Sequence, residues 1–387
     1  MGRRLRIGLV STYPPTHCGV AEYTRFLVNA LFSVCPDVEI TVFCDENRLR
    51  GEGLREGVVS AFTRGKPEFN GLLDGLAEVN GVDVIHVQHE YGIYTEKGAI
   101  LKALRQAKKE RLTRAVVITM HTVCHPLSNR KGAVKLQGKL EEYVDAIVVH
   151  SELQEYELQI QGVNPAKISR IPHGTLINPY LDLPRESLLK ILGLREGERR
   201  ITLVTPGFIR PDKGLDILLR ASELTGVRGG FRLVVAGEAT DPKAEKLVRE
   251  GVERGELAWI NRYLSSKELL ALMALADAIV LPYKDVRGSL SVSGILHMSM
   301  GSMKPIIGSR TPRLVELYKH APRLTVRPLS PEELALKLRW LLENYDYAVA
   351  YTAPVYAYAA RTQWPRMARR HLELYRVLLT EEKPILP

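Results

Sequence analysis

The sequence is poor in cysteine and has no long apolar run. Its 387 residues include only four cysteines, all in the first third of the chain, and their spacing matches no zinc motif, so we expect free thiols. No segment approaches the roughly 18 consecutive apolar residues of a membrane-spanning helix. The apolar run 7–10, which follows basic residues, is shorter than the core of a signal peptide. We therefore expect a cytoplasmic protein.

Low-complexity tracts are absent as well. Hydrophobic residues make up 45% of the chain and charged residues 25%, which is typical of a globular protein. A chain of 387 residues is too long for one ordinary hydrophobic core, so the length predicts two domains. Amide side chains are scarce beside plentiful charged residues and prolines, which suggests a thermophilic source.

Acidic residues are outnumbered by basic ones. The 44 acidic and 54 basic residues leave a formal net charge of +10, which favours anionic partners such as nucleic acid, an acidic membrane surface or a phosphorylated substrate. The basic residues are dispersed and no known nucleic-acid-binding motif is present, so we expect no nucleic-acid partner. A denser basic stretch at 102–114 indicates either a face for an anionic membrane or acceptor, or an ordinary solvated helix face.

Apolar, strand-like runs alternate with helical patterns along the whole chain. Strands that are apolar along their length, alternating with helices, predict a parallel, doubly wound α/β sheet. The alternation occurs twice, so we expect two Rossmann-like domains facing across a cleft, with ligands beyond the carboxyl ends of the strands. Ser330 and Pro331 predict the start of a helix that continues over 332–343. The expected strands are 5–11, 39–43, 82–88, 115–121, 146–150 and 167–171 in the first half, and 201–205, 231–236, 258–260, 278–282 and 305–308 in the second.

The loop at 207–214 has the features of an anion site. It follows the expected strand 201–205 and carries Gly207 and Gly214 just before a helical pattern. Backbone N–H groups lack partners where a helix begins, and Arg210 and Lys213 add two cationic side chains. Two fixed cations suit a diphosphate better than a carboxylate. We therefore predict that a phosphorylated ligand binds at this loop.

Two further loops enter helices through small residues. Gly19 lies where the segment after the first strand enters a helix, so backbone can approach a ligand closely there, although a plain turn has the same composition. At 288–294, three serines and two glycines precede another helix, which is typical of an anion cradle or of a simple capped helix. We predict that this second cradle binds the anion from the side opposite the first.

Polar residues gather after two expected strands of the first half. His86, His89 and Glu90 close the strand 82–88, and His121 and His125 close the strand 115–121. Polar groups at the carboxyl ends of parallel strands mark a candidate site, whereas any one of these histidines taken alone is as well explained by a structural role. Their spacing is not that of a known metal motif, so we expect no bound metal.

The order of these elements resembles the retaining nucleotide-sugar glycosyltransferases of family four (glycosyl transferases group 1), which have the GT-B fold. The ordered set carries the resemblance over nearly the whole chain, rather than any single motif. It consists of the Gly19 loop, 119–121, 171–174, 207–214, Lys304-Pro305, Glu316, and Trp364 with the basic final helix. The segments 88–92 and 293–296 resemble one branch of that family.

The resemblance implies a domain and role for each candidate residue. It implies an amino-terminal acceptor domain of residues 1–173, joined by a returning carboxyl-terminal helix in 360–387, and a donor domain of residues 174–359. Arg210 and Lys213 would hold the donor diphosphate and stabilise the charge of the leaving nucleoside diphosphate, and His121 would lie beside the transferred sugar. The other donor-side candidates are Gly19, Gly207, Gly237, Arg262, Tyr263, Ser291, Ser293 and Gly294, and the acceptor-side candidates are His17, His89, Glu90 and Tyr91.

The sequence departs from that family at four positions. The family has two glutamates, separated by seven residues, ahead of a Gly-Lys-Pro turn, and here those places hold Leu290 and Met298. The turn glycine is replaced by Met303, and the arginine that follows the loop glycine is replaced by Phe208, with Arg210 two residues later. Neither Leu290 nor Met298 can bind a sugar hydroxyl or a ribose.

Two functions therefore follow from the sequence. The first is a retaining hexosyltransferase that moves a sugar from a UDP- or GDP-linked donor to a glycan, lipid-linked or small-molecule acceptor. No Asp-x-Asp motif is present, in agreement with metal-independent transfer, and we expect no cofactor besides the donor. The second is a non-catalytic nucleotide-sugar or glycan-binding relative that acts as the partner of an active transferase. For either function we expect a cytoplasmic location, including the inner face of the membrane.

Overall fold

The chain folds into two compact α/β units in a computed structural model, which describes residues 4–45, 55–195, 200–226, 230–284 and 286–380. The first unit comprises Met1–Gly174, Arg287–Val292 and Trp364–Pro387, and the second comprises Thr175–Val286 and Ser293–Gln363. The return to the first unit therefore begins at Trp364 rather than at residue 360. The segment Arg287–Val292 of the first unit was expected in the second.

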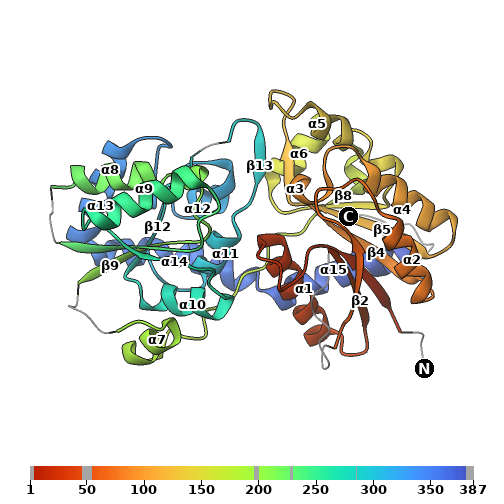
Figure 1. Ribbon diagram of the computed structural model, residues 1–387, viewed down its shortest axis with the longest axis horizontal. Coiled ribbons are helices and arrows are strands. Elements are labelled where there is room, and N and C mark those ends of the chain that lie inside the picture. The colour runs from red at the N-terminus through yellow and green to blue at the C-terminus, as the bar shows by residue number, and fades with distance from the viewer. Residues whose placement is uncertain (1–3, 46–54, 196–199, 227–229, 285, 381–387) are drawn as a thin grey trace. The chain divides into compact units, whose positions relative to one another are not determined.

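The first unit is built on a seven-stranded parallel sheet (Figure 1). Its central strand β4 is buried over all eight residues, as expected for a sheet that is covered on both faces. The strand order is β3-β2-β1-β4-β5-β7-β8. The strands are β1 (Arg6–Val10), β2 (Glu39–Asp45), β3 (Gly57–Phe62), β4 (Val82–His89), β5 (Thr113–Met120), β7 (Ala146–Val149) and β8 (Ile168–Arg170).

Helices cover this first sheet, and the last helix of the chain packs against the first one. Figure 1 shows α15, in blue, beside α1, in red, and the buried Trp364 at the start of α15 stacks on Phe26 of α1 with ring centroids 5.6 Å apart. The helices of this unit are α1 (Gly19–Val34), α2 (Asn70–Glu78), α3 (Tyr91–Tyr94), α4 (Ala99–Lys109), α5 (Lys131–Gln137), α6 (Glu152–Ile160) and α15 (Trp364–Leu379).

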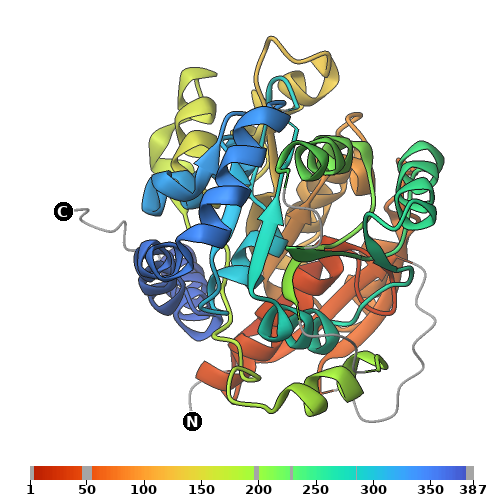
Figure 2. The same cartoon turned by 90° about the vertical axis from the view of Figure 1, so that its left-hand side faces the viewer.

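The second unit repeats the design with six parallel strands in the order β11-β10-β9-β12-β14-β15. Figure 1 shows α8, α9 and α13 on one side of this sheet and α7 and α10 on the other, and Figure 2 shows the same cartoon turned by 90°. The strands are β9 (Ile201–Pro206), β10 (Phe231–Ala236), β11 (Ala258–Ile260), β12 (Ala278–Leu281), β14 (Ile306–Ser309) and β15 (Thr325–Val326). The helices are α7 (Arg185–Leu192), α8 (Leu215–Leu224), α9 (Pro242–Glu253), α10 (Ser266–Leu275), α11 (Gly294–Met300), α12 (Val315–His320), α13 (Pro331–Glu343) and α14 (Tyr345–Arg361).

The predicted fold class is confirmed, and strand order locates the candidate site in each unit. In both sheets the order reverses beside the first strand of the unit, between β1 and β4 and between β9 and β12. The connections that leave two such neighbouring strands run in opposite directions, which leaves a crevice at the carboxyl ends where ligands bind. The loops after β1, β4, β9 and β12 are therefore the places to look for a ligand.

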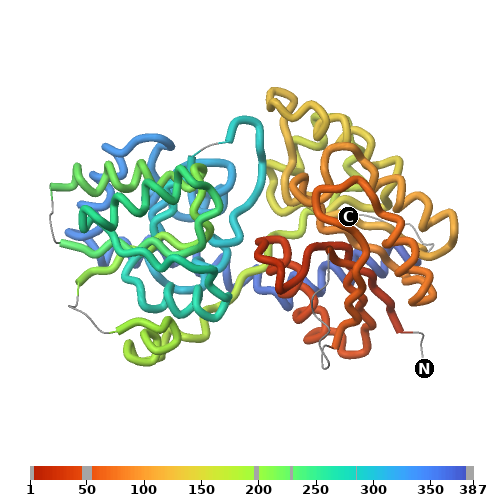
Figure 3. Tube along the Cα trace, in the orientation of Figure 1, coloured from red at the N-terminus to blue at the C-terminus, as the bar shows by residue number. Residues whose placement is uncertain are grey.

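A short antiparallel ribbon within the first unit corrects one sequence prediction. Residues 288–294 were predicted to form one loop that cradles an anion, but Ser289–Ser291 is a strand, β13, that pairs with β6 (Thr122–Cys124) in the register Leu290↔Val123. Figure 3 traces the chain through this segment. Gly288 makes the approach possible, because a Cβ on it would lie 2.8 Å from the Cβ of Ser128. The strand escaped prediction because its partner lies more than 160 residues away in the sequence.

Among the described residues, no helix combines the length and the apolar character that crossing a membrane requires.

Candidate functional site

The loop after β9 is held in place by glycines that approach other backbone closely. Gly207 has φ of +106°, and a Cβ on Gly237, after β10, would lie 2.1 Å from the carbonyl oxygen of Gly207. A Cβ on Gly214 would lie 1.9 Å from the carbonyl oxygen of Pro282. These contacts require glycine at Gly237 and Gly214 for packing alone, and they fix the loop at the carboxyl edge of the sheet.

Lys213 is the most unusual side chain of this loop, because it is a buried cation. It ends a short 3-10 turn, Pro211–Lys213, and is only 7% exposed. Its Nζ lies 2.8 Å from the hydroxyl of the fully buried Tyr283, which follows β12, and that hydroxyl lies 3.3 Å from Oγ of Ser293. Loops after the two strands at the reversal of strand order therefore meet in one hydrogen-bonded chain.

The pKa values of Lys213 and Tyr283 are both shifted by their surroundings. Burial lowers the pKa of Lys213, and contact with Tyr283 offsets only part of that effect. Burial alone would raise the pKa of Tyr283, but Lys213, Ser293 and Arg313 outweigh burial and lower that pKa below its ordinary value. The pair thus holds a positive charge away from water, in a place where an anionic ligand would be bound strongly.

Two more cations stand beside Lys213, and one was not predicted. Arg210 and Arg313 both form ion pairs with Asp212, and the guanidinium of Arg313 lies 5.3 Å from the centroid of the Tyr283 ring. We call Arg210, Lys213 and Arg313, together with Asp212 and Tyr283, the cationic cluster. Its signal in the sequence was weak, because Arg313 lies four residues beyond β14 and about a hundred residues from the loop.

Tyr263 faces an aromatic neighbour, whereas Arg262 is engaged within the protein. The rings of Phe208 and Tyr263, from the loops after β9 and β11, lie 5.9 Å apart between centroids, and both side chains are partly exposed. The guanidinium of Arg262 forms an ion pair with Glu268 and donates to the carbonyl oxygen of Leu192 at 3.1 Å. Both predicted residues keep exposed surface, and Tyr263 together with Phe208 adds aromatic surface.

The three residues that were predicted to form the second anion cradle belong to different elements. Ser293 caps α11 by accepting from the backbone N–H of Leu296 at 3.2 Å, and Gly294 is the exposed first residue of that helix. Ser291 instead lies in β13, paired with Thr122, and belongs to the first unit. Only Ser293 of this set is joined to Lys213, through Tyr283.

The two apolar residues at the places of the family glutamates both pack into hydrophobic cores. Leu290 packs against the core of the first unit, and its carbonyl oxygen accepts from Nε2 of the buried Gln154 at 3.2 Å. Met298, in α11, packs against the core of the second unit. A buried carboxylate remains nearby in Glu316, whose Oε1 lies 3.8 Å from Nε2 of the fully buried His297.

In the first unit, Gly19 and His17 lie exposed in the segment that enters α1. Gly19 is the first residue of this helix, and a Cβ on it would meet no heavy atom within 4 Å. Packing therefore does not explain a glycine at this position, unlike Gly214 or Gly237. The prediction that Gly19 lets a ligand approach the backbone stays open, and so does that for His17.

His121 follows β5, and its side chain is partly buried. Its Nε2 lies 3.1 Å from Oε1 of Gln88, and because an amide oxygen only accepts, Nε2 carries the proton and Nδ1 is left as an acceptor. Nε2 of Gln88 lies 3.3 Å from Nε2 of His86, so hydrogen bonds connect His121 through Gln88 to the buried His86. Burial, followed by the nearby histidines, lowers the pKa of His121 well below its usual value, so the imidazole is neutral at pH 7.

Other histidines surround His121 in the interior of the first unit. The ring of Tyr23 is the common neighbour, with centroids 4.7 Å from His121, 5.2 Å from His150 and 5.0 Å from His173. In the part of the chain that the structure describes, no group of three or more histidine, cysteine, aspartate or glutamate side chains is arranged to hold a metal ion.

Three predicted acceptor-side residues prove to have structural positions. His89 is fully buried between the rings of Tyr91 and Tyr94, at centroid distances of 4.9 and 5.5 Å, so it is not accessible to an acceptor. The hydroxyl of Tyr91 is buried and donates to Gln137 at 2.7 Å. Glu90 caps α3 and also accepts from the hydroxyl of Thr122 at 2.6 Å. The sequence placed these residues at the correct edge of the sheet, but of the three only Glu90 keeps part of its surface exposed there.

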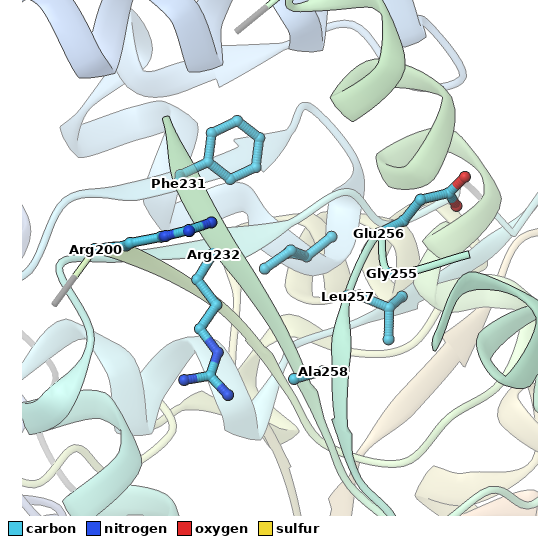
Figure 4. Close-up of a pocket in the computed structure, with 8 residues that line it drawn as sticks. Arg200, Phe231, Arg232, Gly255, Glu256, Leu257 and Ala258 are labelled. Atoms are coloured by element: carbon cyan, nitrogen blue, oxygen red, sulfur yellow. The ribbon is translucent and has the colours of Figure 1, made fainter. Parts of the chain in front are cut away.

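A separate hollow lies at the opposite edge of the second sheet. Figure 4 shows it at the amino ends of β9, β10 and β11, with Arg200, Phe231 and Arg232 on one side and Glu256 on the other. It contains none of the predicted site residues. It is also on the wrong edge for a ligand of a doubly wound sheet, so the cationic cluster remains the candidate site.

The chain is similar to known proteins in sequence and in fold. Residues 200–344, which contain the whole cationic cluster, match a protein-family model described as glycosyl transferases group 1. The chain is also similar to sucrose-phosphate synthase from Thermosynechococcus elongatus, with a TM-score of 0.75 and 17% identity over 97% of this chain and 99% of that one. The chain has the GT-B fold, and residues 200–344 are similar to the group 1 glycosyl transferases.

Two further proteins are similar to this chain. HepE of Anabaena, in complex with UDP and glucose, has a TM-score of 0.74 and 16% identity over 96% of this chain and 100% of that one. The D-inositol 3-phosphate glycosyltransferase of Thermobispora bispora is 24% identical over 291 residues. That match spans 69% of this chain and 66% of the relative, just under two thirds of its length.

Proposed function

We propose that this chain is a retaining, metal-independent glycosyltransferase, which moves a hexose from a nucleoside diphosphate to a glycan, lipid-linked or small-molecule acceptor. The observation that carries the proposal is the buried Lys213, held 2.8 Å from the hydroxyl of Tyr283 at the strand-order reversal of the second sheet. The group 1 domain match supports it, as does the similarity to HepE, which was crystallised with UDP and with UDP-glucose.

Lys213 and Arg210 supply the charge that the reaction needs. When the bond between the sugar C1 and the diphosphate oxygen breaks, negative charge grows on the leaving group. A cation already fixed in a site of low dielectric constant stabilises that charge without reorganising. The acceptor hydroxyl forms the new bond to C1, and its proton passes to the leaving diphosphate, so charge and atoms balance. The proposed step does not require a metal ion bound to the diphosphate oxygens.

The remaining candidates take supporting roles in the proposal. Phe208 and Tyr263 offer aromatic surface against which the donor base stacks. His121, neutral and with its Nδ1 free to accept, contacts a hydroxyl of the transferred sugar rather than acting as a cation. Gly19 lets the first loop of the amino-terminal unit approach phosphate or acceptor. In this proposal, the first unit binds the acceptor.

The first prediction is that Lys213→Met weakens binding of UDP or GDP. Methionine fills much of the lysine volume but removes the charge-assisted contact with phosphate. We expect the binding free energy to fall by about 2 kcal/mol or more. Isothermal titration calorimetry at one fixed salt concentration measures the change. Lys243→Met, which removes an exposed lysine of α9, is the matched control and is expected to leave the affinity unchanged.

Thermal unfolding curves of the parent chain and of Lys213→Met show whether the substitution leaves the stability of the fold unchanged. A Lys213→Met protein that melts like the parent chain but binds nucleoside diphosphates equally well would remove Lys213 from the donor site. Such a result would leave the proposal without the observation that carries it.

The second candidate function is a non-catalytic, nucleotide-sugar-binding relative that acts as the partner of an active transferase. It is favoured by Leu290 and Met298, both of which pack into hydrophobic cores at the places of the family glutamates. Turnover separates the two functions, since both predict binding.

The second prediction is that the chain hydrolyses or transfers the sugar of its donor in the presence of EDTA. We expect the rate with excess EDTA to equal the rate with added Mg²⁺, because Lys213 and Arg210 neutralise the leaving group. Release of nucleoside diphosphate from a panel of UDP- and GDP-hexoses is the measurement. Tight donor binding without release would favour the non-catalytic relative, and a metal requirement would contradict the mechanism.

The cytoplasmic location and the anionic membrane partner are retained as proposals. The basic stretch that suggested them includes α4, where Lys108 forms an ion pair with Asp145 at 2.7 Å and Arg105 lies 4.0 Å from the centroid of the Tyr143 ring. Lys102, Lys109 and Arg111 remain exposed. Part of the positive charge is thus used within the unit, and the exposed remainder is what would contact anionic lipid.

A further inference from the structure

Asp212 is shared by the two arginines of the cationic cluster. Nε of Arg210 lies 3.1 Å from one carboxylate oxygen, Nη2 of Arg210 lies 3.1 Å from the other, and Nη1 of Arg313 also pairs with that second oxygen. Burial alone would raise the pKa of Asp212, but hydrogen bonding with Arg313 and the charges of Arg210 and Lys213 outweigh it, so the pKa is lowered. Two guanidinium groups thus converge on one oxyanion.

The side chain of Arg313 is largely buried, and several contacts fix the residue in place. Its side chain is 17% exposed, and its carbonyl oxygen accepts from the backbone N–H of Ser293 at 3.1 Å. It lies in the turn Pro312–Leu314, just beyond β14. Its guanidinium is therefore carried by the third loop at the carboxyl edge of the sheet, next to the loops of Lys213 and Tyr283.

Two donors near Arg313 are buried but make no hydrogen bond with any described residue. They are Nε of Arg313 and the hydroxyl of Thr311, whose side chain is fully buried. A buried donor without an acceptor destabilises a structure by about 1–3 kcal/mol. Both donors lie in the loop that carries Arg313, and neither of them is used by Asp212.

The charges of the cluster indicate the class of anion that it would bind. Arg210, Lys213 and Arg313 carry three positive charges, and Asp212 cancels only one of them. An excess of two positive charges equals in magnitude the charge of the diphosphate in a nucleotide sugar, where each of the two phosphates carries one negative charge. The planar fork of a guanidinium also bonds two oxygens of one anion at once, as Arg313 and Arg210 already do with a carboxylate.

We propose that Arg313 is a third diphosphate-binding cation, and that Asp212 holds Arg313 and Arg210 in place until the diphosphate takes over their hydrogen bonds. The proposal rests on the proposed function and deepens it. In it, Arg313 determines the specificity for a diphosphate over a monophosphate, and Asp212 is a positioning residue that competes with the ligand.

The test compares inorganic pyrophosphate and inorganic phosphate, together with UDP and UMP, on the full chain by calorimetry. Arg313→Met is expected to weaken pyrophosphate and UDP at least about tenfold, and phosphate and UMP less than about threefold. Arg310→Met is the matched control, because Arg310 lies in the same loop and forms an ion pair with Glu333 at 3.4 Å. It is expected to leave all four affinities unchanged.

Asp212→Asn is the second variant of the test. If the ion pairs of Asp212 had only a structural role, this substitution would not strengthen the binding of UDP or pyrophosphate. Asparagine keeps one acceptor oxygen but removes the competing charge, so UDP and pyrophosphate are expected to bind a few-fold more tightly and with a steeper loss of affinity in salt. Equal UDP affinity in Arg313→Met and the parent chain, or weaker UDP binding in Asp212→Asn, would overturn this inference alone. A parent chain that binds neither pyrophosphate nor any nucleoside diphosphate would overturn the proposed function as well.

Discussion

Lowering the pH from 7 to 5 is expected to unfold the amino-terminal unit. Four of its histidines, His86, His89, His150 and His371, are at most 2% exposed. Burial is the main cause that lowers their pKa values: to about 3 for His89 and His371, to about 4 for His150, and well below the usual value for His86. Each stays neutral in the folded unit at a pH where the unfolded chain is protonated.

The sign and the size of the effect follow from proton linkage. Between a folded pKa of about 4 or less and an unfolded pKa of about 6.5, the unfolded state binds more protons, so stability falls as the pH falls. Above about pH 6.5 the histidines are neutral in both the folded and the unfolded state, so they do not lower the stability there. Each histidine costs the folded state about 1.4 kcal/mol per pH unit, or about 2 kcal/mol at pH 5. Four together cost about 8 kcal/mol, which is comparable with the stability of a whole domain.

Urea unfolding followed by fluorescence at pH 7, 6 and 5 measures this loss. Trp364 is the reporter for the first unit, because it is 4% exposed and packs against Tyr23 and Phe26. A midpoint that stays constant from pH 7 to pH 5 would contradict the prediction. It would also show that the buried histidines are protonated in the folded state.

His89→Phe is the matched variant for the pH series. Neither ring nitrogen of His89 makes a hydrogen bond with a described residue, and the ring stacks on Tyr94, so a phenyl ring preserves the aromatic contact. We expect the variant to gain about 2 kcal/mol over the parent chain at pH 5, because one neutral histidine has been removed. An unchanged pH dependence would exclude His89 from the effect.

Gly214→Ala is expected to unfold the second unit or to destabilise it by about 4 kcal/mol or more. The new Cβ would lie 1.9 Å from the carbonyl oxygen of Pro282 and 2.9 Å from its carbonyl carbon. Both atoms are backbone at the end of β12, so neither can move without displacing the following Tyr283. The φ of +68° adds the strain of a left-handed conformation for any residue with a side chain.

Gly193→Ala separates the clash from the backbone strain. Gly193 has nearly the same φ, +67°, but a Cβ on it would meet no heavy atom within 4 Å. We expect it to cost only about 1 kcal/mol, the penalty of the conformation alone. Free energies of urea unfolding, followed through Trp259 and Trp340 of the second unit, measure both variants. Equal losses in the two would show that Pro282 yields to the new methyl group.

Much of the fold was predictable because its signals are local. Buried parallel strands such as Val82–His89 appear as continuous apolar runs, and the helix Pro331–Glu343 begins with Ser330 as its cap, as the sequence predicted. The ribbon of Ser289–Ser291 with Thr122–Cys124 had no such signal. Three residues are too few to show a period, and the partner strand lies in the other half of the chain.

The candidate site was only partly predictable. Arg210 and Lys213 lie in one loop behind a strand, so a local pattern found both. His89, Glu90 and Tyr91 also followed a strand, but His89 and Tyr91 are buried, and the carboxylate of Glu90 is bonded to Thr122. A sequence pattern locates the edge of a sheet, but the neighbouring elements decide which side chains remain accessible there.

By itself, the sequence determined the two parallel α/β units and the cationic loop between Gly207 and Gly214, because apolar period, helix caps and loop glycines act over a few residues. Only the tertiary structure decided that Arg313 joins Asp212, 101 residues away, and that Leu290 becomes a strand residue of the first unit. The order of strands in a sheet and the packing between loops set such contacts, and neither leaves a periodic mark in the chain.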